Sequence, residues 1–514
     1  MVFRSPYPPI NIPRVALHDF VLGGAVARGH APALVEGATG RVLTYAQLVE
    51  QTRRFAAGLS RAGIRQGDVV AIWSPNSPEY AVVFHAVSRL GAILTTVNPT
   101  YTVEEVAHQL KDAGARMIVT TGALLEKAAA AIASLSVTGV TIDVITIDAV
   151  DGVTSLTSTM VDADPPAVTI DPDHDIVVLP YSSGTTGLQK GVMLTHRNLV
   201  ANLLQIDAME STEIRALLGV LPFFHIYGMV VIMNHGLMRG AAVVTLPRFD
   251  LEAVLRILQD YPIGIAHVVP PVVIAFAKHP MIERFNLSNL HTLFSGAAPL
   301  GSELTKAVEA RLPIQVRQGY GMTELSPVTH YTPFGGARAG KAGLLTPSTE
   351  MRIVDPETGA DLAEGQAGEV WIRGPQVMKG YLNNPEATAR TIDADGWLHT
   401  GDVGVVDAEG YLEVVDRLKE LIKVKAFQVA PAELEALLLK HPKIADAAVF
   451  GVPDDECGEV PKAVVVLREP LTSDEVKAFV EEHVAHYKRL RHVVFADTIP
   501  KSPSGKILRR LLRT

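Results

Sequence analysis

The sequence predicts an α/β protein with a large N-terminal domain of layered α/β subdomains plus a β-rich subdomain, followed by a small α+β C-terminal domain. Three observations predict this fold class. Helical and strand-like patterns alternate before residue 150, short strands rich in glycine and charge follow residue 335, and a new helix–strand pattern starts after residue 416. Helices that alternate with short apolar strands are typical of layered, largely parallel sheets.

The N-terminal alternation is clearest between residues 45 and 147. Segments of helical periodicity are expected to form helices, and short apolar runs between turn residues are expected to form buried strands. The expected helices are 45–62, 78–90 and 103–110, and the expected strands are 68–73, 115–121 and 143–147. The polar, proline-containing segment 155–173 is expected to be a loop.

The later segments predict two smaller units. Strands at 350–354, 368–373 and 410–415 indicate a mostly antiparallel, β-rich subdomain. The last unit has expected helices at 431–440 and 473–484 and expected strands at 445–452 and 462–467. The charged run 416–420 is the expected boundary, which divides the chain into an N-terminal domain, 1–416, and a C-terminal domain, 417–514.

Composition limits the class of protein. Of the 514 residues 48% are hydrophobic and 20% charged, so a large packed core is expected. The net charge of −9 argues against nucleic acid as a partner. Cys457 is the single cysteine, which fits a cytoplasmic protein without disulfides. The most apolar region, 216–247, is interrupted by polar residues and proline, so no membrane span is expected.

One glycine-rich segment carries the most chemical information. Glycine lets backbone N–H groups approach a ligand, hydroxyl groups add donors, and lysine adds a mobile positive charge. Together these predict a polyphosphate site formed by Ser182, Ser183, Gly184, Thr185, Thr186, Gly187 and Lys190. The spacing differs from that of a Walker loop, and a polar surface turn is the alternative.

The segment 318–324, Gln-Gly-Tyr-Gly-Met-Thr-Glu, suits a nucleotide. Tyr320 can stack on a base, Thr323 can bond a phosphate, and Glu324 is a hard oxygen ligand suited to Mg²⁺. The alternative is the start of a helix, with Thr323 as its N-cap.

Other candidates stand singly. His225 lies in an apolar passage and is either a satisfied core histidine or a group that meets anionic oxygens in a cleft. Gly296 and Ala297 follow an apolar strand, where a flat ligand could lie against the backbone. Asp402 could bind ribose hydroxyls or face solvent, and Lys506 follows a flexible turn as many surface lysines do.

The order and spacing of these segments resemble the adenylate-forming acyl-CoA synthetase superfamily over essentially all 514 residues. The branch that looks most similar is the 4-coumarate–CoA ligases, because the sequences of residues 3–5, 222–227 and 428–435 resemble those of that branch. The resemblance implies an ATP-dependent ligase in which a carboxylate attacks the α-phosphate of Mg·ATP to give acyl-AMP and pyrophosphate. The thiol of coenzyme A then attacks the acyl carbon and releases AMP.

The resemblance also implies residue roles. The segment 182–190 would hold the β- and γ-phosphates, with Gln318, Gly319, Tyr320, Gly321 and Thr323 at the adenine and α-phosphate. Asp402 and Arg417 would grip the ribose, Glu324 would hold Mg²⁺, and His225 would lie beside the acyl carboxylate. Lys506 would neutralise the transition state of the first step.

Further positions match the acyl pocket and the second step. The resemblance places the acyl pocket at Tyr227, Gly296, Ala297, Gly321, Pro327 and Val328. Lys419 matches a hinge about which a mobile C-terminal domain turns, which would bring Lys423 and Gln428 to the active site. Lys425, Ala426 and Phe427 match a channel for coenzyme A.

One position departs from the family pattern, because Ala426 stands where the family has glycine. The added methyl group could narrow the channel or strain a positive φ, which would slow thioester formation and spare adenylation. A slight shift of the loop with no measurable effect is the alternative.

Aromatic propenoic acids such as 4-coumarate are the expected substrates, because Tyr227 can stack on a ring and Gly296 and Gly321 leave space for one. Medium- or long-chain fatty acids are the alternative substrates. Two alternative functions are a protein that binds an acyl-adenylate without turnover and a module that loads a separate carrier protein.

Overall fold

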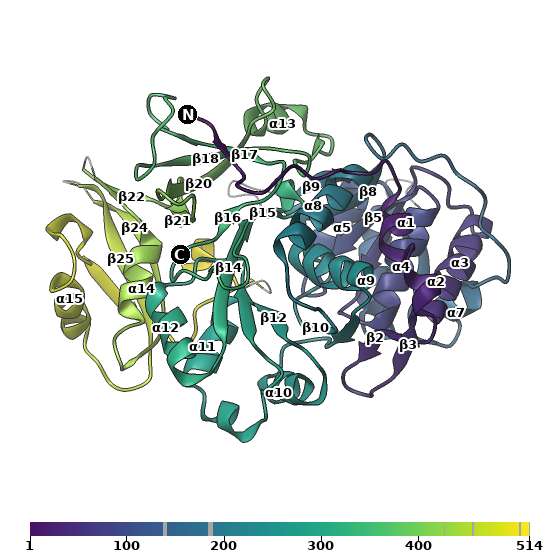
Figure 1. Cartoon of the computed structure of the whole chain (residues 1–514), viewed down its shortest axis with the longest axis horizontal. Coiled ribbons are helices and arrows are strands. Elements are labelled where there is room, and N and C mark those ends of the chain that lie inside the picture. Colours follow the sequence, from purple (N-terminus) through teal and green to yellow (C-terminus); the bar gives the residue numbers. More distant parts are fainter. Residues whose placement is uncertain (137–140, 183–188, 426, 455–456, 503–504, 513–514) are drawn as a thin grey trace.

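The structure is a computed structural model that describes residues 1–136, 141–182, 189–425, 427–454, 457–502 and 505–512. The strands among these residues form five sheets. Figure 1 shows the N-terminal elements in purple and blue on one side, a green β-rich sheet at the top, and the C-terminal elements in yellow on the other side. The predicted α/β fold class, with a large N-terminal and a small C-terminal domain, is confirmed.

A seven-stranded sheet forms the core of the N-terminal part, in the order β19-β9-β8-β5-β4-β6-β7. The strands β8, β5, β4, β6 and β7 run parallel, β9 pairs antiparallel with β8, and β19 pairs antiparallel with β9. Their bounds are β4 Val69–Trp73, β5 Ile93–Val97, β6 Ala115–Thr120, β7 Asp143–Thr146, β8 Ile176–Ser182, β9 Lys190–Thr195 and β19 Gly380–Tyr381.

Helices cover both faces of this sheet, which explains why its central strand β4 is buried along its whole length. One face packs against α3, α4 and α8, and the other packs against α5 and α6. Capping boxes start α3 at Thr44, α5 at Thr102 and α8 at Thr195. The helices are α3 Tyr45–Arg61, α4 Pro78–Arg89, α5 Val103–Asp112, α6 Leu125–Ser136 and α8 His196–Met209.

Two further sheets continue the N-terminal domain. The first has the order β10-β11-β2-β3 and the second has the order β12-β13-β14-β15-β16. The strands are β2 Pro32–Glu36, β3 Val42–Thr44, β10 Ala216–Gly219, β11 Ala242–Thr245, β12 Ile265–Val268, β13 Thr292–Ser295, β14 Gln315–Gly321, β15 Val328–Tyr331 and β16 Leu344–Leu345. The helices of these layers and the N-terminus are α1 Leu17–Leu22, α2 Ala25–Arg28, α9 His235–Arg239, α10 Leu251–Asp260, α11 Pro270–Lys278 and α12 Ser302–Arg311.

The β-rich sheet is antiparallel throughout, as predicted, in the order β1-β17-β18-β20-β21. Its strands are β1 Phe3–Arg4, β17 Glu350–Val354, β18 Ala367–Arg373, β20 Leu398–Val406 and β21 Leu412–Arg417. The helix α13, Pro385–Thr391, lies beside it (Figure 1).

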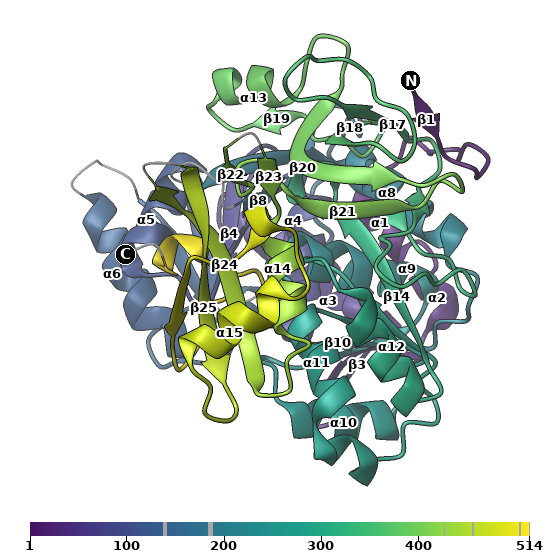
Figure 2. The same ribbon diagram turned by 90° about the vertical axis from the view of Figure 1, so that its left-hand side faces the viewer.

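The C-terminal elements form their own sheet, which faces the viewer in Figure 2. Helices α14 and α15 pack on one face of β24 and β25 to make a separate hydrophobic cluster. The elements are β22 Ile422–Val424, β23 Phe427–Val429, α14 Pro431–Leu438, β24 Ile444–Asp454, β25 Gly458–Leu467, α15 Ser473–Glu481 and β26 His492–Phe495.

The structure differs from the sequence expectations in a few places. The segment 155–173 contains a short helix, α7 Leu156–Thr159, because Ser155 caps it through the backbone of Ser158. Strand β5 had no sequence expectation, although it pairs with β4 and β8 in the centre of the sheet. The expected strand 410–415 begins two residues later, after a turn at Gly410 where φ is 86°. No helix in the described residues is both long and apolar enough to cross a bilayer.

Buried histidines predict acid sensitivity. His85 on α4 is fully buried, and neither ring nitrogen has a hydrogen-bond partner among the described residues. Burial, and secondarily the charge of His18, lowers the pKa of His85 from 6.5 to about 3. Protons then bind the unfolded chain more strongly than the folded one. The contribution of His85 to stability is therefore complete above pH 6.5 and is lost as the pH falls from 6.5 towards 3.

We expect His85→Leu to unfold at a lower pH than the wild type and to match or exceed its stability at pH 7.5. The measurement is the melting temperature across pH 4 to 8. Replacement of the exposed His30 by leucine is the control and should leave the acid profile unchanged. An unchanged acid profile for His85→Leu would show that His85 does not cause the acid sensitivity.

Candidate active site

The predicted phosphate segment joins two neighbouring antiparallel strands. Ser182 is the last residue of β8, Lys190 is the first residue of β9, and the two face each other across the ladder. The connection between them contains Ser183, Gly184, Thr185, Thr186 and Gly187, which lie outside the described residues. The described ends of the segment, Ser182 and Lys190, therefore lie side by side at one end of the β8–β9 pair.

Glu324, which follows β14, connects to Ser182 at the end of β8 by a hydrogen bond. Its Oε1 atom accepts a hydrogen bond of 2.9 Å from Ser182 Oγ and another of 2.9 Å from Tyr381 Oη. Lys190 Nζ lies 4.8 Å from the centroid of the Tyr381 ring. Glu324 is 5% exposed. A carboxylate, a hydroxyl group and a lysine thus meet at the start of the phosphate segment.

A short helix does start in this segment, but Thr323 does not cap it. Thr323 is the first residue of a 3-10 helix, Thr323–Leu325, and Met322 occupies the N-cap without a side-chain hydrogen bond. The Thr323 hydroxyl group is therefore not assigned to capping.

Tyr320, Asp402 and Arg417 form a connected cluster. Tyr320 Oη donates a hydrogen bond of 2.7 Å to Asp402 Oδ2, and Arg417 Nε lies 3.5 Å from Asp402 Oδ1. Asp402 on β20 and Arg417 on β21 are paired across the antiparallel ladder. Burial raises the pKa of Asp402, and the charge of Arg417 opposes that shift.

Lys506 joins the same cluster from the C-terminal domain. Burial and the charge of Arg417 lower the pKa of Lys506, while the carboxylates of Asp402 and Glu324 act in the opposite direction. The charge of Lys506 also lowers the pKa of His225. Lys506 is therefore partly buried and lies within electrostatic range of the residues that sequence analysis assigned to ribose, metal and acyl carboxylate.

His225 is a neutral histidine with a defined tautomer. Burial lowers its pKa to about 3, and the charge of Lys506 adds to the shift. Its Nδ1 atom accepts a hydrogen bond of 3.2 Å from the backbone N–H of Tyr227. The ring proton must then reside on Nε2, which leaves His225 with one N–H donor for a ligand.

Tyr227 is held from three sides. It begins a π-helical segment, Tyr227–Asn234, and π-helical turns are frequent at functional sites. Its hydroxyl group lies 3.3 Å from His267 Nδ1 and donates to the carbonyl oxygen of Phe294 at 3.2 Å. A Cβ atom added at Gly296 would lie 2.8 Å from the Tyr227 ring. Tyr227 and Gly296 therefore form one wall.

Gly321 has a different role from Gly296. A Cβ atom added at Gly321 would lie 1.9 Å from the carbonyl oxygen of Pro327. The missing side chain there makes room for the backbone of Pro327 and Val328 rather than for a substrate ring, which corrects the sequence interpretation. Asn202 holds Val328 through both its backbone N–H and its carbonyl group, at 3.1 and 2.7 Å.

The residues assigned to the second step lie on the hairpin of β22 and β23. Lys423 and Gln428 face each other across this hairpin and are exposed. Lys425 has a φ of 55° and donates its backbone N–H to Cys457, and Phe427 stacks on Tyr487 at 4.3 Å. These contacts lie within the C-terminal domain. Ala426 is outside the described residues.

Three supporting groups were missed by sequence reasoning. Tyr381 bonds to Glu324 across 57 residues, His267 contacts Tyr227 across 40 residues, and Asn202 contacts Val328 across 126 residues. A fourth group is the fully buried ion pair of Arg317 and Glu210, at 2.8 Å. Nothing in their local sequence marks them, because their partners come from distant segments.

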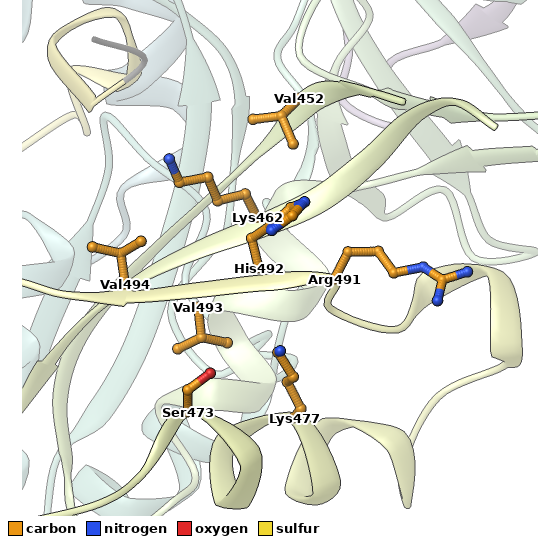
Figure 3. Close-up of a pocket in the computed structure, with 8 residues that line it drawn as sticks. All are labelled: Val452, Lys462, Ser473, Lys477, Arg491, His492, Val493 and Val494. Carbon is orange, nitrogen blue, oxygen red and sulfur yellow. The ribbon is translucent and has the colours of Figure 1, made fainter. Parts of the chain in front are cut away.

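A separate hollow lies on the C-terminal sheet. Figure 3 shows Lys462, Lys477, Arg491 and His492 around the strand β26. The hollow that they line has a volume of about 360 Å³. Positive side chains beside a short edge strand discourage pairing with other chains. None of the predicted site residues lines this hollow.

Comparison with known proteins identifies the family. Residues 24–382 match the AMP-binding enzyme family, and residues 433–506 match the AMP-binding enzyme C-terminal domain. The chain belongs to the AMP-binding enzyme family. The predicted resemblance to the adenylate-forming acyl-CoA synthetases is thereby confirmed.

Relatives within the AMP-binding enzymes span the whole chain. The chain is 46% identical over 532 residues to 4-coumarate–CoA ligase 5 of Oryza sativa subsp. japonica, covering 100% of this chain and 97% of that protein. It is also 46% identical over 530 residues to 4-coumarate–CoA ligase 2 of Nicotiana tabacum, with the same coverage. The predicted similarity to this branch is confirmed.

Solved structures of other AMP-binding enzymes share the fold. ATP-bound MatB from Rhodopseudomonas palustris superposes with a TM-score of 0.88 at 30% identity, covering 98% of both chains. The anthranilate CoA ligase AuaEII in complex with anthranoyl-AMP gives a TM-score of 0.88 at 25% identity, covering 98% of this chain and 97% of that one.

The two site glycines should respond differently to the same change. In Gly296→Ala the new methyl group meets the Tyr227 ring, a side chain rather than backbone, so the ring must shift against its bonds to His267 and Phe294 and disturb the wall of the acyl pocket. We expect the KM of the carboxylic acid to rise about tenfold, with the KM of ATP unchanged. In Gly321→Ala the methyl group meets backbone that cannot move away, so we expect a loss of several degrees in melting temperature.

Steady-state kinetics and thermal melting of both variants test this contrast. Gly301→Ala is a matched control, because its Cβ atom would lie 3.7 Å from its nearest neighbour, Ala436 Cβ. Equal effects at Gly296 and Gly321 would refute the different roles.

Proposed function

We propose that this AMP-binding enzyme is an ATP-dependent carboxylate–CoA ligase that acts on 4-coumarate or a related aromatic acid in the cytoplasm. The observation that carries the proposal is that the segment with Lys506 lies against the N-terminal domain, since a Cβ atom added at the preceding Gly505 would lie 3.3 Å from Val269. At this position the charges of Asp402 and Glu324 act on the Lys506 ammonium group. The full-length similarity to 4-coumarate–CoA ligases supports the class of substrate.

The first step joins two anions, so positive charge and oriented donors must do most of the work. Lys190 and the hydroxyl groups of the phosphate segment hold the β- and γ-phosphates, and Thr323 contacts the α-phosphate. Lys506 neutralises the charge that develops between the carboxylate and the α-phosphate. The partial burial of Lys506 supports this role, since a charge removed from bulk water acts through a lower local dielectric.

The nucleotide is oriented by the cluster around Asp402. The carboxylate of Asp402 and the guanidinium group of Arg417 bind the ribose hydroxyls, and the Tyr320 ring lies against adenine beside Gln318, Gly319 and Gly321. The hydrogen bond from Tyr320 to Asp402 supports this arrangement, because it fixes the ring and the carboxylate relative to each other.

Glu324 is the proposed Mg²⁺ ligand. No group of three or more histidine, cysteine, aspartate or glutamate side chains in the described residues could hold a metal ion. Mg²⁺ bound to nucleotides often takes one or two carboxylates and completes its shell with phosphate oxygens and water. A single carboxylate fits that pattern. The ion neutralises phosphate charge when it is bound.

The acid binds between His225 and the wall formed by Tyr227 and Gly296, with Ala297, Pro327 and Val328 completing the pocket. The Nε2–H group of His225 donates to a carboxylate oxygen. Because the pKa of His225 is about 3, this donor stays neutral at working pH and does not hold the carboxylate as an ion pair. The carboxylate therefore remains free to attack.

The second step needs a turn of the C-terminal domain, 417–514, about Lys419. That turn withdraws Lys506 and presents Lys423 and Gln428, with Lys425, Ala426 and Phe427 along the channel for coenzyme A. The exposure of the β22–β23 hairpin and its contacts within its own domain support this proposal.

A paired assay with 4-coumarate tests the function. We expect pyrophosphate release with ATP, and AMP with a thioester when coenzyme A is added. One pyrophosphate per enzyme with little thioester would implicate Ala426, and Ala426→Gly should then restore turnover. Activity only with octanoate would replace the aromatic substrate by fatty acids, and no pyrophosphate with any acid would favour a protein that binds without turnover.

Glu324→Gln tests the metal site. Glutamine keeps an oxygen that can accept from Ser182 and Tyr381, so folding should be preserved, but the negative charge is lost. We expect pyrophosphate release to fall about a hundredfold and the Mg²⁺ concentration for half-maximal rate to rise, consistent with the loss of charge stabilisation. Tyr381→Phe, which keeps the carboxylate, is the control and should retain most of the activity. An unchanged Mg²⁺ requirement in Glu324→Gln would exclude Glu324 as the ligand.

A further inference from the structure

Arg509 lies three residues after Lys506 and uses all of its side-chain nitrogens. Its Nη2 atom donates to both oxygens of Glu435, at 2.8 and 2.9 Å. Its Nε atom donates to the carbonyl oxygen of Val449 at 2.9 Å, and its Nη1 atom pairs with Glu420. The Arg509 side chain is 14% exposed, so these contacts of Arg509 are largely shielded from solvent. We call Arg509 with Glu435, Val449 and Glu420 the Arg509 junction.

The partners of Arg509 belong to three separate parts of the C-terminal domain. Glu435 lies on α14, Val449 lies on β24, and Glu420 directly follows the proposed hinge residue Lys419. An arginine has a planar fork of donors, so several simultaneous contacts fix its direction as well as its distance. Arg509 therefore ties the segment that carries Lys506 to the sheet, to the helix and to the hinge.

A contact across the proposed hinge extends this junction. Asp416, the residue before Arg417 on β21, accepts a hydrogen bond of 2.8 Å from the backbone N–H of Ala432 near the start of α14. The same helix carries Glu435, which Arg509 holds. A continuous path of contacts thus runs from Lys506 through Arg509 and α14 to the strand that carries Arg417.

We propose that Arg509 is a positioning residue for adenylation, which fixes Lys506 relative to the hinge through Glu420 and Glu435. This inference rests on the proposed function. Rotation at the hinge then delivers or withdraws Lys506 together with the rest of the domain. The segment that carries Lys506 does not move independently of the hinge. Displacement of a catalytic group by about 1 Å can lower a rate by about a hundredfold, so this junction matters for rate more than for substrate binding.

Half-reactions separate positioning from simple stability. Arg509→Lys keeps the charge but cannot reproduce the fork of contacts. We expect pyrophosphate release with 4-coumarate and ATP to slow about 10- to 100-fold, with both KM values within about twofold. Thioester formation from supplied 4-coumaroyl-AMP and coenzyme A does not use Lys506 in this proposal, so its rate should stay within about threefold.

Glu420→Gln is a second variant, which leaves the contacts of Arg509 with Glu435 and Val449 in place. It should also slow pyrophosphate release while sparing thioester formation, but by a smaller factor than Arg509→Lys. Arg489→Gln breaks an exposed ion pair with Glu481 in the same domain and is the matched control. It should leave both half-reactions unchanged.

Two results would overturn the role of Arg509. One is an equal fall of both half-reactions in Arg509→Lys and Glu420→Gln, which would indicate a structural role alone. The other is adenylation at the wild-type rate in both variants. Absence of pyrophosphate release by the wild-type chain would instead refute the proposed function, and the positioning role with it.

Discussion

Repulsion between a carboxylate and a triphosphate is the constraint on which the proposed site depends. Cations must surround the reacting atoms, yet cations without a ligand repel one another, as the effect of Arg417 on the pKa of Lys506 shows. Asp402 and Glu324 offset that repulsion. The site is thus a cluster of opposite charges whose members come from three sheets and from the C-terminal domain. In the proposed mechanism the cluster contains Lys506 only while the C-terminal domain holds its present position.

Neutral groups complete this charge pattern. His267 is buried and His225 is partly buried, and desolvation lowers the pKa of each to about 3. They supply directed nitrogen atoms without adding charge next to Lys506. Behind them, Arg317 and Glu210 form a fully buried pair, which also accepts the Tyr331 hydroxyl group. Arg317 Nε also donates to the carbonyl oxygen of Thr332 at 2.8 Å. These contacts fix strand β14, whose end carries Tyr320.

Local sequence patterns predicted most helices and strands, because helix caps and hydrophobic periodicity depend on residues that are close in the sequence. Thr44 and Gln47 start α3 where helical periodicity begins, and the glycine-rich segment does join two strands. Contacts between distant segments were not predictable. Gly296 and Gly321 look alike in sequence, but one faces a ring and the other faces backbone. Tyr381 had no assignment from the sequence, although its hydroxyl group donates to Glu324 in the structure.

The spacing at the end of β21 has a consequence for engineering. Arg417 is paired with Asp402 in the ladder, and only Leu418 separates it from Lys419. The proposed pivot therefore begins almost inside the nucleotide site, with no spacer that could absorb an inserted or deleted residue. Chimaeras that exchange small domains between such enzymes should be joined beyond Glu420, so that pivot and ribose ligand are inherited from the same parent. The incoming domain must then supply an arginine at the position of Arg509 to pair with Glu420.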